Sequence, residues 1–244
     1  MLILCYHAVS PTWPAALSVT PEHLERQLEW LVRRGYRGVT FAEALALPPG
    51  RNVVVTFDDA YRSVLTLGAP ILQRLGLPGT VFAPTAWMDR DEPMTWPGID
   101  EWIGTEHESE LMPLSWDELG DLADQGWEVG SHTRTHPRLT QVGDEQLRAE
   151  LVGSREDCEA RLGRPCRTIA YPYGDHDVRV RMAAREAGYD AACILARSQR
   201  HGDRFGWPRL GIYQHDERRR FVLKSSRTVR RLLRTRLAAE YFSR

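Results

Sequence analysis

The sequence predicts an α/β fold in which parallel strands close, or nearly close, into a barrel. Short apolar runs alternate with segments of helical period along the 244 residues. Continuously apolar runs are typical of strands buried on both faces, and strands separated by helices pair in parallel through right-handed crossovers. The predicted strands are MLILCY (1–6), NVVVTF (52–57), GTVFA (79–83), WEVGSH (127–132), RTIAY (167–171) and DAACIL (190–195).

Helix signals fill the segments between these strands. Thr20 can cap a helix that has Pro21 at its first position, leucines on one face, and Gly35 as its stop. Two more helices are predicted, one marked by Leu147, Leu151, Cys158 and Leu162 and ended by Gly163, and one over residues 178–188.

Composition indicates a soluble globular protein, with 42% hydrophobic and 27% charged residues. No linker divides the chain, so we expect one domain over residues 1–216 followed by a basic helical extension over 217–244. The first apolar run lacks the features of a signal peptide, and the four cysteines form no CxxC pair. These observations favour a reducing, cytoplasmic location.

A long insert over residues 86–114 carries Trp87, Trp96 and Trp102 among acidic residues and prolines. Such a length is unusual for a plain connection. Two interpretations are open: the insert is a lid or substrate rim, or its tryptophans pack a satellite core.

Two adjacent aspartates, Asp58 and Asp59, stand directly after the strand predicted at residues 52–57. Neighbouring carboxylates repel, and burying either one is costly unless a cation or a hydrogen-bond donor compensates for it. The pair therefore indicates a bound metal or a turn. In the alternative, one Asp caps a helix that starts near Tyr61, because Asp is a favoured N-cap, but this explains only one of them.

The motif SHTRTHP (131–137) places His132 and His136 four residues apart. Imidazoles at this spacing can share a metal, and Pro137 favours a bent loop over a helix. The spacing alone is a weak signal. Joined to one of the two aspartates it gives a ligand set for Zn²⁺ or a similar divalent ion, and the second carboxylate stays free as a general base.

Two further features complete the candidate site. His7 follows the first predicted strand, and the turn YPYG (171–174) follows the fifth. The turn can present a backbone N–H to a developing oxyanion, and its rings can flank a sugar. These groups would lie at the carboxyl ends of parallel strands, where barrel enzymes place their chemistry. Asp175, His176 and Asp177 resemble ligands, but they precede a predicted helix and capping is favoured.

The chain resembles the polysaccharide deacetylases of carbohydrate esterase family 4, which share the nodulation-type (NodB) homology domain. TFDDAYRS resembles the family's first motif, SHTRTH its second, and AYPYG its third, in the form found in the branch that deacetylates poly-N-acetylglucosamine. The opening YH, the segment VTPEHLERQLEWLVRRGYRGVTFAEAL and the late RFGWPRLGIY are also similar to that branch. The resemblance therefore extends to about Tyr213.

This resemblance implies a distorted (β/α) barrel that holds one divalent metal ion, with Zn²⁺ first and Co²⁺, Ni²⁺ or Fe²⁺ as alternatives. It implies Asp58 as the catalytic base and the backbone N–H of Tyr173 as an oxyanion donor. The implied metal ligands are Asp59, His132 and His136.

Two departures from the family pattern lead to further expectations. Many members have an arginine that tethers the base where this chain has Ala170, and Arg209 is our candidate substitute. Many members also have a catalytic histidine in a C-terminal Leu-x-His motif, which is absent here, and we expect His7 to supply that group. We expect Tyr171, Trp207 and Arg209 to bind substrate.

The implied activity is metal-assisted removal of N-acetyl groups from an amino sugar in a glycan, with acetate as the second product. A deacetylase or deformylase of a lipid-linked sugar, or a ureide amidohydrolase, would use the same site. From a different class, a catalytically inactive glycan- or metal-binding protein could share the fold. Against this last alternative, Asp58 and His7 are both present although metal retention needs neither. The sequence does not indicate an oligomeric state.

The basic end, residues 218–236, contains nine Lys or Arg and no acidic residue. Ser225 or Ser226 could cap an amphipathic helix there, with an apolar stripe of Val229, Leu233, Leu237 and Tyr241. Such a helix can lie on the anionic inner surface of a membrane. Alternatively, it packs its stripe against the barrel and leaves its arginines in solvent. Nucleic-acid binding is not expected, since the run has no interleaved aromatic residues.

Overall fold

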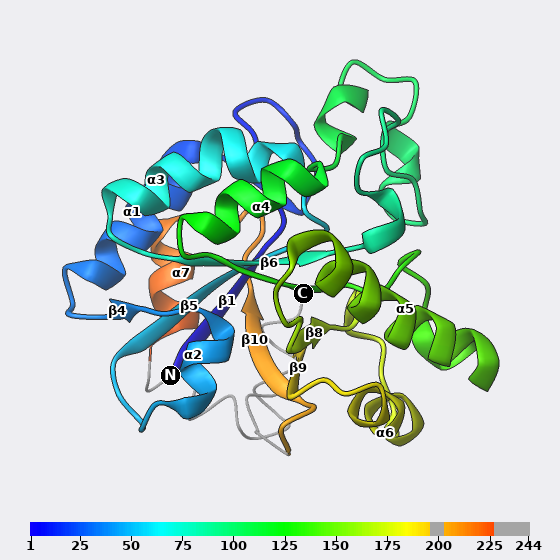
Figure 1. The fold of residues 1–244 in the computed structure, drawn as a ribbon. Coiled ribbons are helices and arrows are strands. Elements are labelled where there is room, and N and C mark those ends of the chain that lie inside the picture. Colours follow the sequence, from blue (N-terminus) through cyan, green and yellow to red (C-terminus); the bar gives the residue numbers. More distant parts are fainter. Residues whose placement is uncertain (196–202, 227–244) are drawn as a thin grey trace.

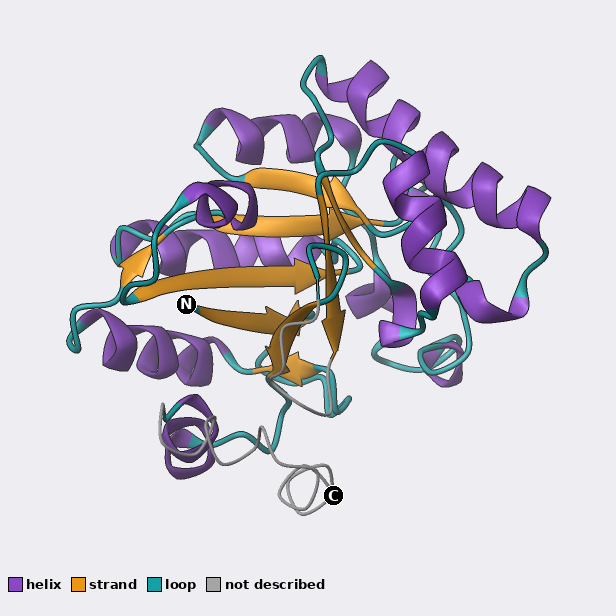
Figure 2. Ribbon diagram, turned by 90° about the horizontal axis from the view of Figure 1, so that it is seen from below, coloured by secondary structure: helices purple, strands orange, loops and turns teal. Residues whose placement is uncertain are grey.

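The computed structural model describes residues 1–195 and 203–226. Eight of its strands form an all-parallel sheet with helices packed around it, and β2 (Ala8–Val9) and β3 (Ser18–Val19) form a separate parallel pair (Figure 1 and Figure 2). The strands are β1 Leu2–Tyr6, β2 Ala8–Val9, β3 Ser18–Val19, β4 Arg37–Gly38, β5 Asn52–Asp58, β6 Gly79–Ala83, β7 Glu128–Ser131, β8 Thr168–Ala170, β9 Ala191–Leu195 and β10 Trp207–Gly211. The α-helices are α1 Pro21–Val32, α2 Phe41–Ala46, α3 Ala69–Arg74, α4 Trp116–Asp124, α5 Asp144–Leu162, α6 Val178–Glu186 and α7 Arg218–Ser225.

The sheet closes on itself. Its strand order is β1-β10-β9-β8-β7-β6-β5-β4, and β1 also pairs with β5. Leu4 is the register partner of Leu210 on β10 and of Val55 on β5, so β1 bridges the two sides of the barrel. The described strands thus form a seven-stranded parallel barrel, and β4 extends beside β5. This confirms the predicted fold class.

Strand alternation divides the apolar side chains between two layers. One cluster, which includes Ile3, Val54 and Phe82, fills the barrel interior. The neighbouring positions along the same strands, such as Val53 and Val55, belong to a larger cluster shared with the surrounding helices. Both faces of the strands are therefore buried, which explains why their sequences are continuously apolar.

The predicted element boundaries agree closely with the structure. Thr20 caps α1, its hydroxyl accepting a hydrogen bond from the His23 N–H at 3.2 Å. Gly163 ends α5 with φ +63°, a left-handed conformation that glycine adopts without steric cost. The six predicted strands correspond to β1, β5, β6, β7, β8 and β9, and the three predicted helices to α1, α5 and α6.

The C-terminal end of the described chain packs on the barrel. Phe221 of α7 is buried and meets Trp30 of α1 edge to face, with ring centroids 6.1 Å apart. The residues of the predicted apolar stripe, from Val229 onward, lie outside the described residues, so the boundary at 216/217 stays a prediction. Among the described residues, no helix combines the length and apolar character needed to cross a bilayer.

Candidate metal centre and active site

The polar residues singled out in the sequence gather at the carboxyl ends of the barrel strands. Asp58 is the last residue of β5, His7 follows β1, and His132 follows β7. Because all these strands run parallel, their carboxyl ends meet at one end of the barrel. Residues as far apart in the sequence as His7 and His132 therefore lie close together in space.

The two aspartates turn in different directions. Asp58 keeps the extended conformation of β5, while Asp59 has φ +69° and Ala60 has φ +54°. The helix that follows begins at Arg62, and no hydrogen bond among the described residues joins either carboxylate to a backbone N–H of its first turn. The capping alternative is therefore wrong, and the backbone reversal separates the roles of the two side chains.

The side chains of Asp59, His132 and His136, hereafter the metal centre, converge in the structure. Asp59 Oδ1 lies 3.4 Å from His132 Nε2 and 3.3 Å from His136 Nε2. Ligand atoms that share one tetrahedral zinc ion at about 2.1 Å are separated by about 3.4 Å, so these spacings fit a single ion. All three residues are buried, at 5% exposure or less.

The chemistry of the metal centre also fits a cation. Asp59 Oδ1 and His136 Nδ1 are buried without a hydrogen-bond partner among the described residues. Burial raises the pKa of Asp59, but contacts with His136 and the other nearby histidines outweigh it and lower the pKa overall. An ionised carboxylate beside two imidazoles, with buried polar atoms left over, is a site that a divalent ion would complete.

His132 is prepared as a ligand by its second ring nitrogen. Its Nδ1 lies 2.7 Å from the Ala170 carbonyl oxygen. A carbonyl can only accept, so Nδ1 carries the proton and Nε2 presents a lone pair to the metal centre. Burial lowers the pKa of His132 to about 4, against the opposing effect of the nearby carboxylates. The imidazole is therefore neutral at pH 7, as ligation requires.

Trp96, from the insert over residues 86–114, holds His136 in place. The two rings stack with centroids 4.1 Å apart and an angle of 23°. Trp96 in turn meets Trp87 edge to face at 5.7 Å, and Trp102 packs against Trp13 at 5.9 Å. The tryptophans of the insert therefore pack, as one interpretation expected, but they join the main core cluster and not a separate satellite core. The same packing places Trp96 against His136.

Asp58 forms a buried, bidentate ion pair with Arg209 of β10. The two Nη atoms of Arg209 lie 2.5 and 2.7 Å from the two carboxylate oxygens, and both residues are 2% exposed or less. Burial would raise the pKa of Asp58, but the guanidinium and the nearby His132 hold it well below its usual range. The geometry is that of a tether for Asp58, the role expected of Arg209 in place of the arginine missing at Ala170.

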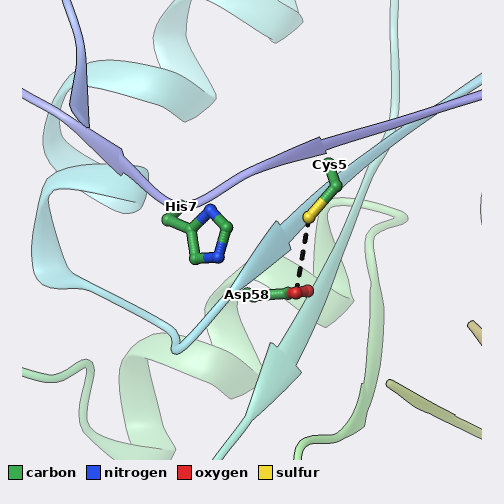
Figure 3. A group of neighbouring side chains, drawn as sticks. All are labelled: Cys5, His7 and Asp58. Carbon is green, nitrogen blue, oxygen red and sulfur yellow. Dashed lines mark hydrogen bonds between the residues drawn. The ribbon is translucent and has the colours of Figure 1, made fainter. Parts of the chain in front are cut away.

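Figure 3 shows Cys5 of β1 and His7, just after β1, both turned toward Asp58. The Cys5 thiol donates to Asp58 Oδ2 at 3.4 Å, and the ligand atoms of the three residues lie within 4.8 Å of one another. His7 is half-buried, and its Nδ1 has no hydrogen-bond partner among the described residues. His7 thus lies within reach of a group bound between Asp58 and the metal centre.

The YPYG turn places Tyr173 beside the metal centre. Tyr173 has φ +58°, and its ring meets His136 edge to face with centroids 4.7 Å apart. The next two amides of the turn are occupied, since the Gly174 N–H donates to the Tyr171 carbonyl and the Asp175 N–H to the Pro172 carbonyl, each at 2.9 Å. The N–H of Tyr173 is the remaining donor of this turn.

Backbone strain is concentrated at this end of the barrel. Non-glycine residues with positive φ are uncommon, and each costs on the order of 1–3 kcal/mol unless its surroundings over-determine it. The described residues with this conformation are Asp59, Ala60, Thr133, His136 and Tyr173, all in the three site loops, and Asp89.

The structure does not place the expected substrate-binding residues at the surface of the site. Tyr171 is 1% exposed, stacks on His176 and donates to the Phe205 carbonyl at 3.3 Å. Arg209 is equally buried in its pair with Asp58. Trp207 begins β10 at the opposite, amino end of the strands, where it packs edge to face on Phe41. We therefore assign none of the three to direct contact with substrate.

The acidic cluster after the YPYG turn serves structure, as predicted. Asp177 caps α6 by accepting from the Val180 N–H at 2.8 Å. Asp175 accepts from the N–H and hydroxyl of Thr140. The His176 Nδ1 lies 2.9 Å from the Gly174 carbonyl. None of them joins the metal centre.

The sequence did not indicate the roles of three residues near the site. Cys5 contacts Asp58, Trp96 stacks on His136, and Glu150 binds the loop between His132 and His136. A signal existed only for Glu150. It occupies a core position of α5, in line with the buried residues Leu147, Leu151, Ser154 and Cys158. A carboxylate inside an apolar stripe is unusual and indicates a buried hydrogen-bonding role.

Comparisons with known proteins agree with the geometry. A family model described as polysaccharide deacetylase matches residues 47–192. The Bacillus subtilis protein YxkH, whose name assigns it to the polysaccharide deacetylases, is 26% identical over 193 residues, which are 77% of this chain and 61% of that protein. The poly-β-1,6-N-acetyl-D-glucosamine N-deacetylase of Escherichia coli O157:H7 is 31% identical over 204 residues, 71% of this chain and 30% of that protein. The chain thus spans less than two thirds of the length of either relative.

The solved structure of the deacetylase PplD of Streptococcus pyogenes, in complex with acetate, superposes with a TM-score of 0.76. The match covers 93% of this chain and 98% of PplD at 20% sequence identity. At this identity the likeness concerns the fold, and it supports the barrel described above.

Proposed function

The chain belongs to the polysaccharide deacetylase family, and we propose that it is a metal-dependent hydrolase that removes N-acetyl groups from an amino sugar within a glycan. The observation that carries this proposal is the pairing of two carboxylates with separate partners. Asp59 faces the two histidines of the metal centre, while its neighbour Asp58 is held by Arg209. This pairing supports the proposal that Asp59 is a metal ligand and Asp58 a base.

We propose Zn²⁺ as the ion, with Co²⁺, Ni²⁺ or Fe²⁺ as alternatives, because two imidazole nitrogens and one carboxylate oxygen leave coordination positions open. Asp59, His132 and His136 would hold it. When bound, such an ion polarises a carbonyl group and lowers the pKa of water, potentially from about 16 to about 7.

Asp58 is the proton acceptor for the attacking water. The ion pair with Arg209 keeps it ionised and fixes its plane. A carboxylate has about four lone-pair sites, of which the guanidinium uses two and the Cys5 thiol a third, so one remains for the water. The low pKa that Arg209 imposes means that Asp58 is a weak base in isolation. Asp58 can therefore accept a proton only from a water whose pKa is lowered, which is consistent with its place beside the metal centre.

The remaining steps fall to Tyr173 and His7. The Tyr173 N–H can donate to the developing oxyanion of the acetyl carbonyl, a contribution that is strongest when the donor is fixed in advance. His7, which lies close to Asp58, can protonate the nitrogen of the leaving amine as the C–N bond breaks. Acetate and a free amino sugar are the products.

The direct test is acetate release from N-acetylglucosamine oligomers by the zinc-loaded protein, with chelated protein as the control. We expect equal amounts of acetate and new free amine, and none after chelation. Glycan binding without turnover would support the inactive-binder alternative instead. If the protein instead releases formate from N-formylated sugars, or hydrolyses only ureides, its site serves a different amidohydrolase activity.

Replacing His7 with Ala should lower kcat by about 10²- to 10⁴-fold with little change in KM, as expected of a general acid that acts in the transition state. The loss should be much smaller with an aryl acetate, whose phenolate leaves without protonation. Comparing the two substrates in steady-state assays isolates the acid step. An equal loss on both would show that His7 does not protonate the leaving group.

We also keep as a proposal that the segment 218–236 contacts an anionic membrane on the cytoplasmic side. In its described part, Arg218 and Arg219 are exposed, whereas Lys224 and Arg220 pair with the buried Asp216. α7 is therefore anchored to the barrel, and membrane contact would rest on the remaining arginines, at positions 227, 230, 231, 234 and 236.

Exchanging the arginines at 227, 230, 231 and 234 for Gln should abolish co-sedimentation with anionic vesicles, since each basic residue near the surface contributes on the order of 1 kcal/mol. Neutral vesicles should bind neither form. Equal, salt-insensitive behaviour of the variant and the natural chain would leave the segment with a packing role alone.

A further inference from the structure

The loop between the two histidines of the metal centre is held in a conformation that its own residues do not favour. Thr133 has φ +66° and His136 has φ +63°, and neither is glycine. Both angles determine where His136 Nε2 points. Whatever fixes the peptide groups between these two residues therefore fixes the geometry of the metal centre.

One buried carboxylate binds those peptide groups. Glu150 Oε2 accepts from the N–H of Arg134 at 2.8 Å and from the N–H of Thr135 at 2.9 Å, and Oε1 accepts from the Thr135 hydroxyl at 2.5 Å. Glu150 is 5% exposed and projects from the middle of α5, a rigid element. Three hydrogen bonds thus connect the helix to the two residues that lie between the left-handed positions.

No cationic side chain pairs with Glu150 within the described part of the chain. The nearest candidate, Arg134, directs its Nε to Asp157 at 3.1 Å instead. The charge of Glu150 is therefore offset by the two backbone N–H groups and the hydroxyl, and such charge-assisted hydrogen bonds are stronger than neutral ones. All three hydrogen bonds that the carboxylate accepts come from the loop.

We propose that Glu150 is a positioning residue for the metal centre: it clamps the Arg134–Thr135 peptide so that His136 meets Asp59. The inference rests on the proposed function, because it concerns the same metal centre, but it predicts effects on metal affinity that can be measured without substrate. The hydrogen bonds of the Glu150 side chain go to Arg134 and Thr135 and not to the ring nitrogens of His132 or His136.

The test compares three variants at this position. Glu150→Ala removes all three acceptors and should weaken Zn²⁺ binding by about 10- to 100-fold, the range typical of residues that support metal ligands. Glu150→Gln keeps a carbonyl oxygen for the two N–H groups and should bind within about threefold of the natural protein. Glu150→Asp keeps the charge but shortens the reach, so it should behave like Ala; it also replaces Ala if that variant is insoluble.

Zn²⁺ affinity is measured by competition with a chromophoric chelator, and the visible absorption of the Co²⁺-loaded protein reports the ligand geometry. The matched control is Glu128→Ala, since Glu128 accepts three hydrogen bonds, from the Ala42 N–H and the hydroxyls of Thr80 and Thr168. Glu128 is the first residue of β7 and thus lies at the amino end of that strand, away from the metal centre. The control should lower the thermal stability of the metal-free protein but leave Zn²⁺ affinity and the Co²⁺ spectrum unchanged.

Natural affinity and an unchanged Co²⁺ spectrum in Glu150→Ala, or in Glu150→Asp, would overturn the positioning role. So would an equal loss of affinity in the Glu128 control, which would assign the effect to general destabilisation. Failure of the proposed function is distinguishable from both outcomes, because it appears as a lack of acetate release by the zinc-loaded natural protein, whereas the positioning role is measured as metal affinity.

Discussion

Replacing Asp58 with Asn should lower kcat for acetate release by about 10²- to 10⁴-fold while the metal content of the protein stays unchanged. The amide keeps the shape of the carboxylate but cannot accept the proton of the attacking water. Asp58 is engaged by Arg209 and is not part of the metal centre, so its loss should not release the ion. Steady-state kinetics and metal analysis of the same preparation check both parts.

The same substitution should also destabilise the fold, because it leaves the buried charge of Arg209 without a full partner. Breaking a buried ion pair in this way typically costs about 3–5 kcal/mol. The matched control is Asp216→Asn, since Asp216 is fully buried and pairs with Lys224 at 2.7 Å, away from the site. The control should lose comparable stability and keep its kcat. Joint loss of metal and activity in Asp58→Asn would make Asp58 a ligand instead.

Replacing the neighbouring Asp59 with Asn should give the opposite pattern, with metal and activity lost together. Asp59 is the only anionic member of the metal centre, and its Oδ1 faces both imidazoles. We expect Zn²⁺ affinity to fall by more than the roughly 10- to 100-fold typical of supporting residues. Chelator competition measures the affinity, and acetate release should fall to background at stoichiometric zinc.

Treating the unmodified protein with a chelator should reproduce this loss reversibly. Added Zn²⁺ should restore the natural chain fully but the Asp59 variant only at a large excess. A variant that retains one equivalent of metal at natural affinity would contradict the assignment of Asp59. Asp58→Asn should lose activity but keep the metal, whereas Asp59→Asn should lose both. General unfolding would affect both variants alike, so it could not explain this difference.

Much of the fold could be predicted because its signals are local. Thr20 caps α1 and Gly163 ends α5, where their side-chain chemistry predicts a start and a stop. The buried strands are continuously apolar because both of their faces are covered. β10 carries no such signal: Pro208 lacks a donor, and Arg209 places a charge inside the barrel that is tolerated only because Asp58 meets it there.

The metal centre could be proposed from residue types and strand ends, but its supports could not. Trp96 reaches His136 through an insert without helical or strand period, and contacts of that kind depend on tertiary structure alone. The positive φ angles of Asp59 and His136 are likewise invisible, because neither residue type requires them.

The error at Trp207 has a geometric cause. Strand residues two apart face the same side and are separated by about 7 Å along the strand. Trp207 and Arg209 therefore both face the barrel interior, but Arg209 reaches the site while Trp207 lies toward the other end. The two residues thus share a face of β10 but lie at different depths in the barrel.

The most direct test of the account is a crystal structure of the zinc-loaded protein with anomalous diffraction data at the zinc edge. We predict one ion with Asp59, His132 and His136 as ligands at about 2.0 to 2.2 Å, and Asp58 still paired with Arg209. An ion bound instead by Cys5, His7 and Asp58, the other group of potential ligands in the described chain, would contradict the division of roles between the two aspartates.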